Sequence, residues 1–379
     1  MNPAAMQDLA KALATTRGPI AHARTLPAAV YTAPEILAIE QAGLFARTWL
    51  CVGREADIPG TGDFFTRELA GDSVIVLRGA DGLVRAFFNV CRHRGSRLID
   101  ETSGWGLNRI LCPYHAWSYR LDGSLGLAPR ENIGGGDAAQ AEATGIRANL
   151  GLVPVNIGSH DGFIFLNLDS AAAPLTSSLR DLPDLSRFRL AALRRGWRRT
   201  YDVQANWKLI CENYSECYHC PGAHPQLARL SELISRSTRP MEIGASFNGG
   251  PMELKTGIET MSLSGKRTVP VIPGLSADDH RYVYYYVIYP NLLLSPHPDY
   301  VLTHTAWPLA PDRTRVVCEL LFTEEALARP GFDPSDMADF WDLTNRQDWA
   351  LCERTQLGTG SRGYRPGPYQ VSEDCVHTF

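Results

Sequence analysis

The sequence predicts an α+β chain, in which a small β domain precedes a larger domain of mixed strands and helices. Between Trp49 and about Leu168, short apolar runs are separated by Gly, Pro and Asp, which is typical of a small β domain. After a linker at 174–183, longer strand-like runs alternate with helical segments. We expect three parts: an N-terminal helical segment at 1–45 packed on the mixed domain, the β domain at 46–170, and the mixed domain at 171–379.

Composition excludes several classes of protein. The 379 residues include 37 Lys and Arg against 41 Asp and Glu, a net charge of −4 with no basic run, so we expect neither nucleic acid nor an anionic membrane as partner. No apolar stretch approaches the ~20 residues of a membrane span, and residues 1–17 lack the apolar core of a secretory signal. We therefore expect a cytoplasmic protein.

The N-terminal part is expected to contain a helix. Thr32 is a candidate N-cap and Pro34 falls near the first helical position, where a missing N–H costs nothing. Apolar residues then supply the buried faces: Ile36, Leu37, Ile39, Leu44 and Phe45.

The β domain is predicted to contain a hairpin that leads into a Cys–His pair. Runs at 73–77 and 83–88 flank the turn at 79–82, and Cys91 follows. The run at 163–167 is the expected last strand, and the segment 134–143, rich in Gly, Ala and Asp, is an expected surface excursion.

The larger domain is expected to contain helices at both ends and strands between them. The segment 205–219 is helical in composition, and Pro221-Gly222 is expected to stop it. Runs at 282–294 and 314–322 have strand character. Asp333-Pro334 is expected to open a late helix that ends near Gly358.

The pattern C-x-H…C-x-x-H, formed by Cys91, His93, Cys112 and His115, has the ligands of a Rieske [2Fe–2S] cluster, in which two His replace two Cys on one iron. A structural zinc is the alternative, but zinc fingers usually pair like ligands, whereas each half here mixes one Cys with one His. Gly95 marks a loop after the first half. The pattern therefore favours a one-electron iron–sulfur centre, in an electron carrier or in an oxygenase.

A second metal site is predicted at His219 and His224. Alone, two His five residues apart would usually be core or surface residues. With a one-electron centre upstream, they fit a 2-His-1-carboxylate triad, which suits non-haem Fe(II) and leaves positions open for O2 and substrate. The expected carboxylate is Asp348 on the late helix. Three other acids of that helix are rivals: Asp339, Asp342 and Glu353, of which the last two do not share the face of Asp348 well.

Two further residues precede His219. Glu216 is expected one helical turn before His219, where it could orient the imidazole and relay electrons. A solvated helix glutamate is the alternative. Asn213 is expected to lie behind the ligands.

The other seven of the nine cysteines show no framework spacing. We interpret them as reduced thiols: Cys51, Cys211, Cys217, Cys220, Cys318, Cys352 and Cys375.

The two metal motifs together resemble those of the Rieske non-haem iron oxygenases, in particular the catalytic α subunits of ring-hydroxylating and N-demethylating enzymes. The resemblance covers nearly the whole chain, from Trp49 to Phe379. It implies a helix-grip-like catalytic domain with an antiparallel sheet, and a head-to-tail homotrimer. An acidic residue then bridges one subunit's cluster to the next subunit's iron. Glu216 occupies that position, where many ring dioxygenases have Asp.

Glutamate at the bridge, the run 212–219 and the tail from Gly367 to Phe379 look like the choline, carnitine and glycine betaine monooxygenases. The runs 341–349 and 352–356 look closest to betaine and stachydrine demethylases. The resemblance implies a monooxygenase that uses O2, with electrons from NAD(P)H through a flavin- or ferredoxin-type reductase. Hydroxylation of an N-methyl group would then release formaldehyde and the demethylated amine.

A quaternary ammonium substrate would be recognised by aromatic faces. The candidates lie at 282–289, although packing is the usual role of any single one: Tyr282, Tyr284, Tyr285, Tyr286 and Tyr289. For a betaine carboxylate, His304 or Arg281 would serve. Two alternative functions are an aromatic-ring hydroxylating oxygenase and a Rieske electron-transfer protein, and the roughly two hundred residues beyond the β domain argue against the second.

Overall fold

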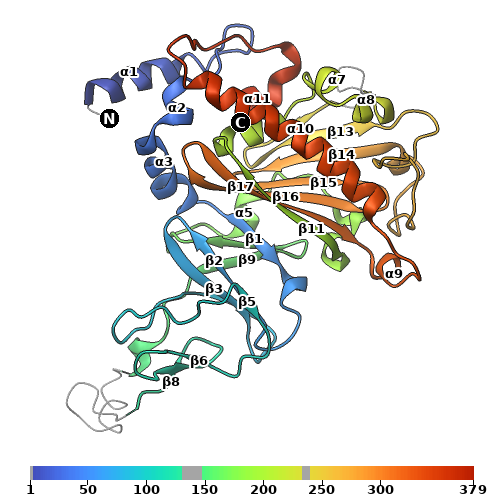
Figure 1. Cartoon of the computed structure of the whole chain (residues 1–379). Helices are drawn as coiled ribbons and strands as arrows, with labels where there is room; N and C mark the ends of the chain where they lie inside the picture. Colours follow the sequence, from blue (N-terminus) through green and yellow to red (C-terminus); the bar gives the residue numbers. More distant parts are fainter. Residues whose placement is uncertain (1–2, 130–146, 233–239) are drawn as a thin grey trace. The chain divides into compact units, whose positions relative to one another are not determined.

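The computed structural model describes residues 3–129, 147–232 and 240–379 (Figure 1). The chain forms two compact units. One is Gln41–Ser178, and the other combines Met1–Glu40 with Leu179–Phe379. The expected excursion at 134–143 lies outside the described residues.

Within its described residues, the smaller unit contains three antiparallel sheets. The first, in the order β1-β10-β9, contains Leu50–Arg54, Phe163–Asn167 and Asn156–His160. The second, in the order β4-β3-β2-β5, contains Val84–Phe88, Asp72–Arg78, Phe64–Leu69 and Ser103–Gly104. The third, in the order β6-β7-β8, contains Ile110–Leu111, Ser118–Tyr119 and Leu125–Leu127. The predicted hairpin is confirmed as β3 and β4, and the run at 163–167 as β10.

The larger unit is built on one antiparallel sheet of seven strands in the order β11-β17-β16-β15-β14-β13-β12. Their bounds are Arg194–Val203, Arg313–Phe322, Val301–Ala310, Leu292–Pro296, Tyr282–Ile288, Phe247–Glu253 and Glu242–Ile243. The expected single strand at 282–294 is two strands, because β14 ends at Ile288 and β15 begins at Leu292. Pro290 between them has no N–H with which to continue a ladder.

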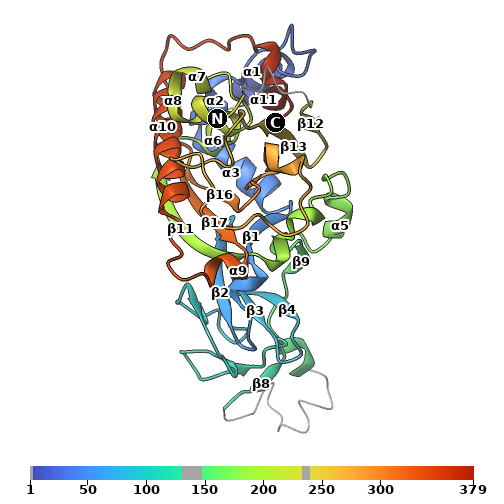
Figure 2. The same ribbon diagram turned by 90° about the vertical axis from the view of Figure 1, so that its right-hand side faces the viewer.

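The 25-residue helix α10 (Ser335–Thr359) covers one face of this sheet (Figures 1 and 2). Phe340 and Trp341 pack in one buried cluster with Leu302 of β16 and Leu320 of β17. This packing holds α10 at a fixed rotation over the sheet, so the helix positions its polar residues as well. The predicted late helix, and with it the α+β class, is confirmed.

The helix expected at 205–219 ends early. It is α6 (Trp207–Tyr214), followed by the short helices α7 (Cys220–Ala223) and α8 (Pro225–Leu230). Pro221-Gly222 therefore lies inside α7 and does not stop a helix. The chain turns at Glu216, whose carboxylate accepts the backbone N–H groups of Tyr218 and His219 and so replaces the helical pattern.

The N-terminal part forms α1 (Pro3–Ala14), α2 (Ala28–Thr32) and α3 (Pro34–Glu40). Pro34 opens a helix as predicted, but Thr32 closes α2 and its hydroxyl donates back to the carbonyl of Ala28, so the N-cap prediction is wrong. The shorter connections are 3-10 and π turns, and α5 (Leu175–Ser178), α9 (Glu324–Leu327) and α11 (Asp374–Thr378) are single turns or little more.

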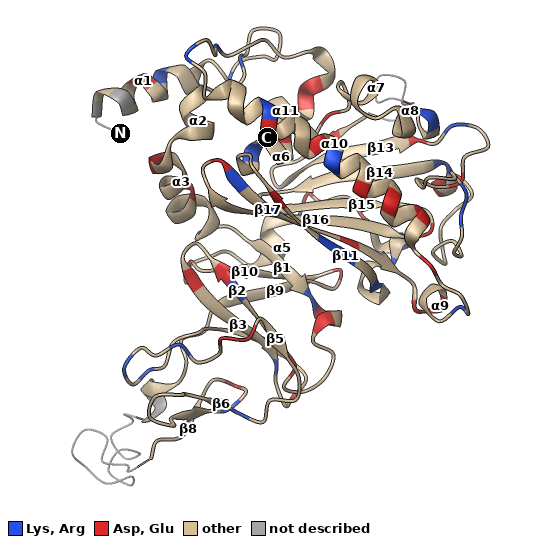
Figure 3. Ribbon diagram, viewed as in Figure 1, with Lys and Arg blue, Asp and Glu red and all other residues tan. Residues whose placement is uncertain are grey.

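Positive and negative side chains are interspersed along the ribbon, as Figure 3 shows. In the part of the chain that the structure describes, no helix has both the length and the apolar character that crossing a membrane requires.

Candidate metal centres

Two tight turns present the first motif. Cys91 lies three residues after β4, and Cys112 directly follows β6. The Gly95 N–H bonds the Cys91 carbonyl and the Ala116 N–H bonds the Cys112 carbonyl, so each turn closes on its own cysteine. Gly95 has φ +72°, a conformation that costs glycine least.

The cysteines of this motif point inward and the histidines outward. Cys91 and Cys112 are each 2% exposed, whereas His93 and His115 are exposed with ring centroids 4.7 Å apart. Burial raises the pKa of the Cys112 thiol, but hydrogen bonds from the backbone N–H groups of Tyr114 and His115 outweigh burial and lower it. A buried cysteine pair beside an exposed histidine pair fits a cluster with one iron at each end.

Neighbouring side chains contact two donors of this motif. Tyr119 Oη lies 3.2 Å from Cys91 Sγ, and the His93 ring stacks on Trp117 at 4.8 Å. These contacts fix the orientation of two of the four donors.

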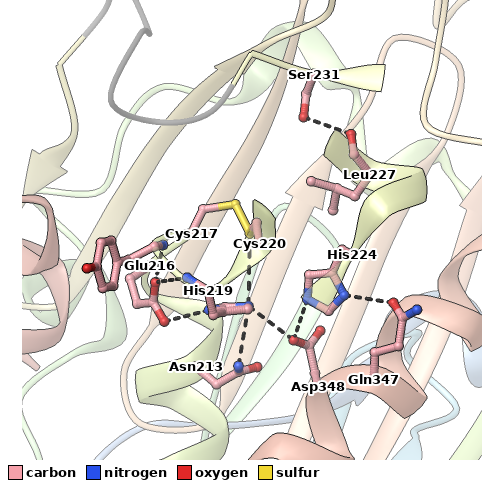
Figure 4. Close-up of a disulfide and its surroundings, with 11 residues drawn as sticks. Asn213, Glu216, Cys217, His219, Cys220, His224, Leu227, Ser231, Gln347 and Asp348 are labelled. Carbon is pink, nitrogen blue, oxygen red and sulfur yellow. Dashed lines mark hydrogen bonds and ion pairs between the residues drawn. A yellow bond between two sulfur atoms is a disulfide. The ribbon is translucent and has the colours of Figure 1, made fainter. Parts of the chain in front are cut away.

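The second motif converges at one point. Asp348 on α10 places Oδ1 2.8 Å from His224 Nε2 and 3.2 Å from His219 Nε2 (Figure 4). The two imidazoles are 5.2 Å apart between ring centroids and nearly perpendicular. His219 precedes α7, and His224 joins α7 to α8. Three donors from two separate segments thus meet with the composition of a facial triad.

A further side chain contacts the Nδ1 atom of each imidazole. His219 Nδ1 lies 2.5 Å from Glu216 Oε1, and His224 Nδ1 lies 2.8 Å from Gln347 Oε1. Gln347 is held in turn by Gln226, whose amide donates over 2.6 Å. Such contacts orient a ligating imidazole and leave Nε2 for the metal. No sequence motif indicated Gln347 or Gln226, although Gln347 stands directly beside Asp348 in the chain.

The electrostatics of the triad favour a cation. Burial lowers the pKa of His219, but hydrogen bonds to Asp348 and Glu216 outweigh it and raise the pKa to about 9. The pKa of His224 is raised for the same reason, with Asp348 and Gln347 as partners. Burial alone would raise the pKa of Asp348, but the two histidines lower it. The negative charge that favours the protonated imidazoles would also attract a divalent cation bound by all three side chains.

The two expected supporting residues lie beside His219. Glu216 is on the loop between α6 and α7, and not on a helix face as expected. Its side chain is only 13% exposed, which argues against the solvated-glutamate alternative. Asn213 Nδ2 lies 3.4 Å from His219 Nε2, on the metal side of the ring.

The rival acids of α10 have other partners or face outward. Asp342 accepts from Tyr201 and pairs with Arg199 and Arg346. Glu353 accepts the backbone N–H of Gln204, and Asp339 is exposed. Among the four acids considered, Asp348 is the one that meets the histidines.

A cavity opens beside the triad, and its wall is strongly aromatic. Four rings line it together with His219, His224 and Asp348: Tyr214, Tyr285, Trp341 and Trp349. Of the five tyrosines considered at 282–289, only Tyr285 is among the lining residues. Tyr284 instead packs on Phe188, and Tyr289 on Phe379.

The two residues considered for a substrate carboxylate differ in position. Arg281 pairs with Glu253 and does not line the cavity. His304 lines it, and burial lowers its pKa to about 4, so this imidazole is neutral near pH 7.

The expectation that all seven remaining cysteines are free thiols is wrong for two of them. Cys217 and Cys220 form a disulfide that brackets His219 (Figure 4). Two cysteines at i, i+3 are close enough to join where the chain turns, and the turn at Glu216 provides this. The others are buried thiols: Cys51, Cys211, Cys318, Cys352 and Cys375.

A β unit with cluster loops and a sheet-and-helix unit with a 2-His-1-carboxylate site are typical of the catalytic subunit of an oxygenase with two iron centres. Comparison with known families agrees, because the Rieske [2Fe-2S] domain matches residues 48–134 and the ring hydroxylating alpha subunit (catalytic domain) matches residues 190–379. The chain belongs to the Rieske non-haem iron oxygenases. It is therefore an enzyme of the Rieske monooxygenase type, whose cofactors are a [2Fe–2S] cluster and a mononuclear iron.

Among curated proteins, the chain is 30% identical over 375 residues to the glycine betaine monooxygenase oxygenase subunit of Pseudomonas aeruginosa (strain UCBPP-PA14), covering 92% of this chain and 85% of that one. It is 31% identical over 353 residues to the carnitine monooxygenase oxygenase subunit of Escherichia coli (strain K12), with coverages of 90% and 86%.

Among solved structures, a quaternary ammonium Rieske monooxygenase implicated in carnitine oxidation by gut microbiota superposes with a TM-score of 0.79. It is 27% identical and covers 94% of this chain and 93% of its own. Naphthalene 1,2-dioxygenase from Rhodococcus sp., at 21% identity and a TM-score of 0.76, covers 100% of this chain and 97% of its own, and shows the shared fold.

Proposed function

We propose that this chain is the terminal oxygenase of an N-demethylating monooxygenase. Its substrate would be a quaternary ammonium compound of the glycine betaine or proline betaine type, and its products the demethylated amine and formaldehyde. The aromatic cavity beside the metal triad is the observation that carries this proposal. The names of the glycine betaine and carnitine monooxygenase relatives support the same chemistry.

The aromatic wall suits a cation that cannot donate a hydrogen bond. The Tyr214 and Tyr285 ring centroids are 5.9 Å apart, and Tyr285 and Trp341 are 6.3 Å apart, in each case edge to face. A desolvated ammonium over such faces gains about 2 kcal/mol. One methyl group of the bound cation would then be directed towards His219, His224 and Asp348.

The cavity wall also offers neutral groups to the oxygen end of a betaine. Four buried polar atoms of lining residues have no hydrogen-bond partner among the described residues: the acceptor Asn248 Oδ1, and Tyr285 Oη, His304 Nδ1 and Trp349 Nε1. An unpaired buried donor costs about 1–3 kcal/mol, and a bound carboxylate or hydroxyl would remove that cost. We infer that the Tyr285 hydroxyl and the Trp349 indole N–H donate to this end. The neutral His304 donates from Nε2 to Asn345 Oδ1, so its Nδ1 is an acceptor and would pair with a substrate hydroxyl.

His219, His224 and Asp348 would hold the mononuclear iron, while Cys91, Cys112, His93 and His115 would hold the cluster. When bound, the two centres supply electrons and O2 activation for hydroxylation of the methyl group. Gln347 and Glu216 keep the two imidazoles oriented, and the apolar rings of the cavity exclude water from the reacting group.

We further infer that Glu216 passes electrons to the iron site, because its carboxylate contacts His219 directly. By resemblance, the electrons would come from a cluster in the neighbouring subunit of a homotrimer. That cluster would be reduced by a flavin- or ferredoxin-type reductase using NAD(P)H.

A reductase-coupled assay tests the substrate proposal. The oxygenase is incubated with a surrogate ferredoxin-type reductase, NADH and one candidate substrate at a time. The candidates are glycine betaine, proline betaine, carnitine, choline and an arene, and formaldehyde is measured against NADH consumed. One formaldehyde per NADH with a betaine is expected. Hydroxylation of the arene without formaldehyde from any amine would favour a ring-hydroxylating oxygenase instead.

A further inference from the structure

The Cys217–Cys220 disulfide lies in the wall of the cavity that holds the metal triad. Both cysteines line the cavity beside His219, and Figure 4 shows the bridge flanking that imidazole. Cys220 Sγ is 3.9 Å from His219 Nε2, the nitrogen that faces Asp348. The disulfide therefore packs in the buried cluster of the large unit and also borders the metal side of His219.

The sulfur of Cys220 lies within reach of a metal at the triad. The ligand atoms of His219, Cys220 and His224 all lie within 4.8 Å of one another. A bridged sulfur is a poor ligand, because a metal binds the thiolate. Cys220 can therefore bind a metal only when its bridge to Cys217 is broken.

The surrounding loop makes the bridge responsive to a small reductant. Cys217 is 8% and Cys220 4% exposed, and what they expose lines a cavity that reaches solvent. The Glu216 carboxylate holds the loop from the other side through the backbone of Tyr218 and the His219 ring. Opening the bridge thus frees Cys220 while Glu216 keeps His219 in place.

We propose that Cys217 and Cys220 form a redox-active pair that controls metal coordination at the triad. A dithiol reductant transfers two electrons and two protons to the bridge, which gives two thiols, and becomes a disulfide itself. Cys220 then binds the metal as a thiolate and its proton passes to solvent. When the pair is reduced, Cys220 is a fourth protein ligand and occupies a coordination position that O2 or substrate needs. When the disulfide is formed, that coordination position stays available.

This inference rests on the proposed triad of His219, His224 and Asp348. Zinc loaded into the iron-free mononuclear site, with the cluster intact, provides a readout that does not depend on turnover. X-ray absorption at the zinc edge separates a sulfur neighbour at about 2.3 Å from nitrogen and oxygen at about 2.0–2.2 Å.

We expect only nitrogen and oxygen neighbours around zinc in the air-oxidised parent, and one added sulfur after treatment with dithiothreitol. Cys217→Ser, which keeps the Cys220 thiol but cannot form the bridge, should show the sulfur without reductant. Cys220→Ser, the matched control, should show none in either condition. A nitrogen–oxygen shell in both the reduced parent and Cys217→Ser would overturn the inference.

Two controls separate this result from the proposed triad. His219→Ala should lose zinc, and full zinc binding by that variant would count against the triad itself. Native alkylation followed by peptide mass analysis should label Cys217 and Cys220 only after reduction. Complete labelling of both cysteines in air-oxidised protein would show that no bridge forms and would overturn the redox pair.

Discussion

Asp348 differs from the other acids of α10 in what its carboxylate meets. It contacts both imidazoles, whereas Asp342 is neutralised by arginines on the same and a neighbouring element. Sequence spacing favoured Asp348, and the structure places this acid against both imidazoles. Only the packing of Phe340 and Trp341 against the sheet determines that this face of α10 turns towards His219 and His224.

Replacing Asp348 by Asn should remove a charged ligand and leave the fold intact. We expect loss of the mononuclear iron and a fall in activity beyond about 100-fold, since loss of a mere supporting partner costs 10–100-fold. Iron analysis and the visible spectrum of the cluster measure both sites in one sample. Asp342→Asn, the matched control, should keep both iron centres, and equal iron loss in the two variants would contradict the assignment of Asp348.

Glu216 is the residue whose surroundings the sequence described least well, because a helical turn was expected where the chain makes a loop. The contact with His219 was nevertheless expected, and it is present at 2.5 Å. Residues three apart also approach each other in a tight turn, so the spacing indicated the pair without indicating the conformation.

Glu216→Gln should keep the hydrogen bond to His219 but remove the negative charge. We expect both iron sites to remain occupied while oxidation of the reduced cluster by O2 and substrate slows by about 10–100-fold, measured by stopped-flow absorbance. Asn213→Ala, also beside His219, provides the comparison for a neighbour outside the relay. An unchanged rate in Glu216→Gln with full iron content would exclude the relay.

At the scale of elements, α6 joins the N-terminal helices to the loop that carries Glu216 and His219. Tyr31 of α2 donates to both oxygens of Glu212, over 2.8 and 3.1 Å, and Lys208 pairs with Glu40 of α3 at 2.6 Å. These contacts are more than 160 residues apart in sequence, so no local pattern could indicate them. They fix the position of α6, and with it Tyr214 and the start of the loop that carries Glu216 and His219.

The Glu212 carboxyl should make stability depend on pH. Burial raises its pKa to about 7, although Tyr31 and Lys208 oppose the shift. A carboxyl whose pKa is higher in the folded state binds more protons when folded, so its contribution to stability is lost as pH rises from about 4.5 to 7.

Glu212→Gln removes this titration and keeps a hydrogen-bond acceptor for Tyr31. Differential scanning calorimetry should show the variant's Tm gaining on the parent's between pH 5 and pH 7, with no further gain above pH 7. The change corresponds to at most about 1.4 kcal/mol per pH unit. A Tm difference that is constant from pH 5 to pH 8 would contradict the raised pKa.

At the scale of the whole molecule, the sequence predicted the α+β class and the β unit with its cluster loops, because these depend on local turn signals and alternating strands. The order of the seven strands in the large sheet depends on long-range pairing, and no sequence pattern indicated it. The disulfide was also missed, since only the turn at Glu216 brings Cys217 and Cys220 together.

The proposed homotrimer predicts a particle of about three times 41.8 kDa. Sedimentation velocity at micromolar concentration measures this directly. A species at the mass of one chain that still oxidises substrate at the full rate would show that electrons need not cross between subunits.

The central claim is that this chain alone holds both metal centres of an N-demethylating oxygenase, and a single-turnover experiment tests it most directly. Protein loaded with iron and cluster is reduced chemically, freed of reductant, and mixed with O2 and glycine betaine or proline betaine without any reductase. We expect up to one formaldehyde per mononuclear iron from the parent, together with oxidation of the cluster. We expect no formaldehyde from His219→Ala. Cluster oxidation without formaldehyde from any quaternary amine, or equal formaldehyde from His219→Ala, would contradict it.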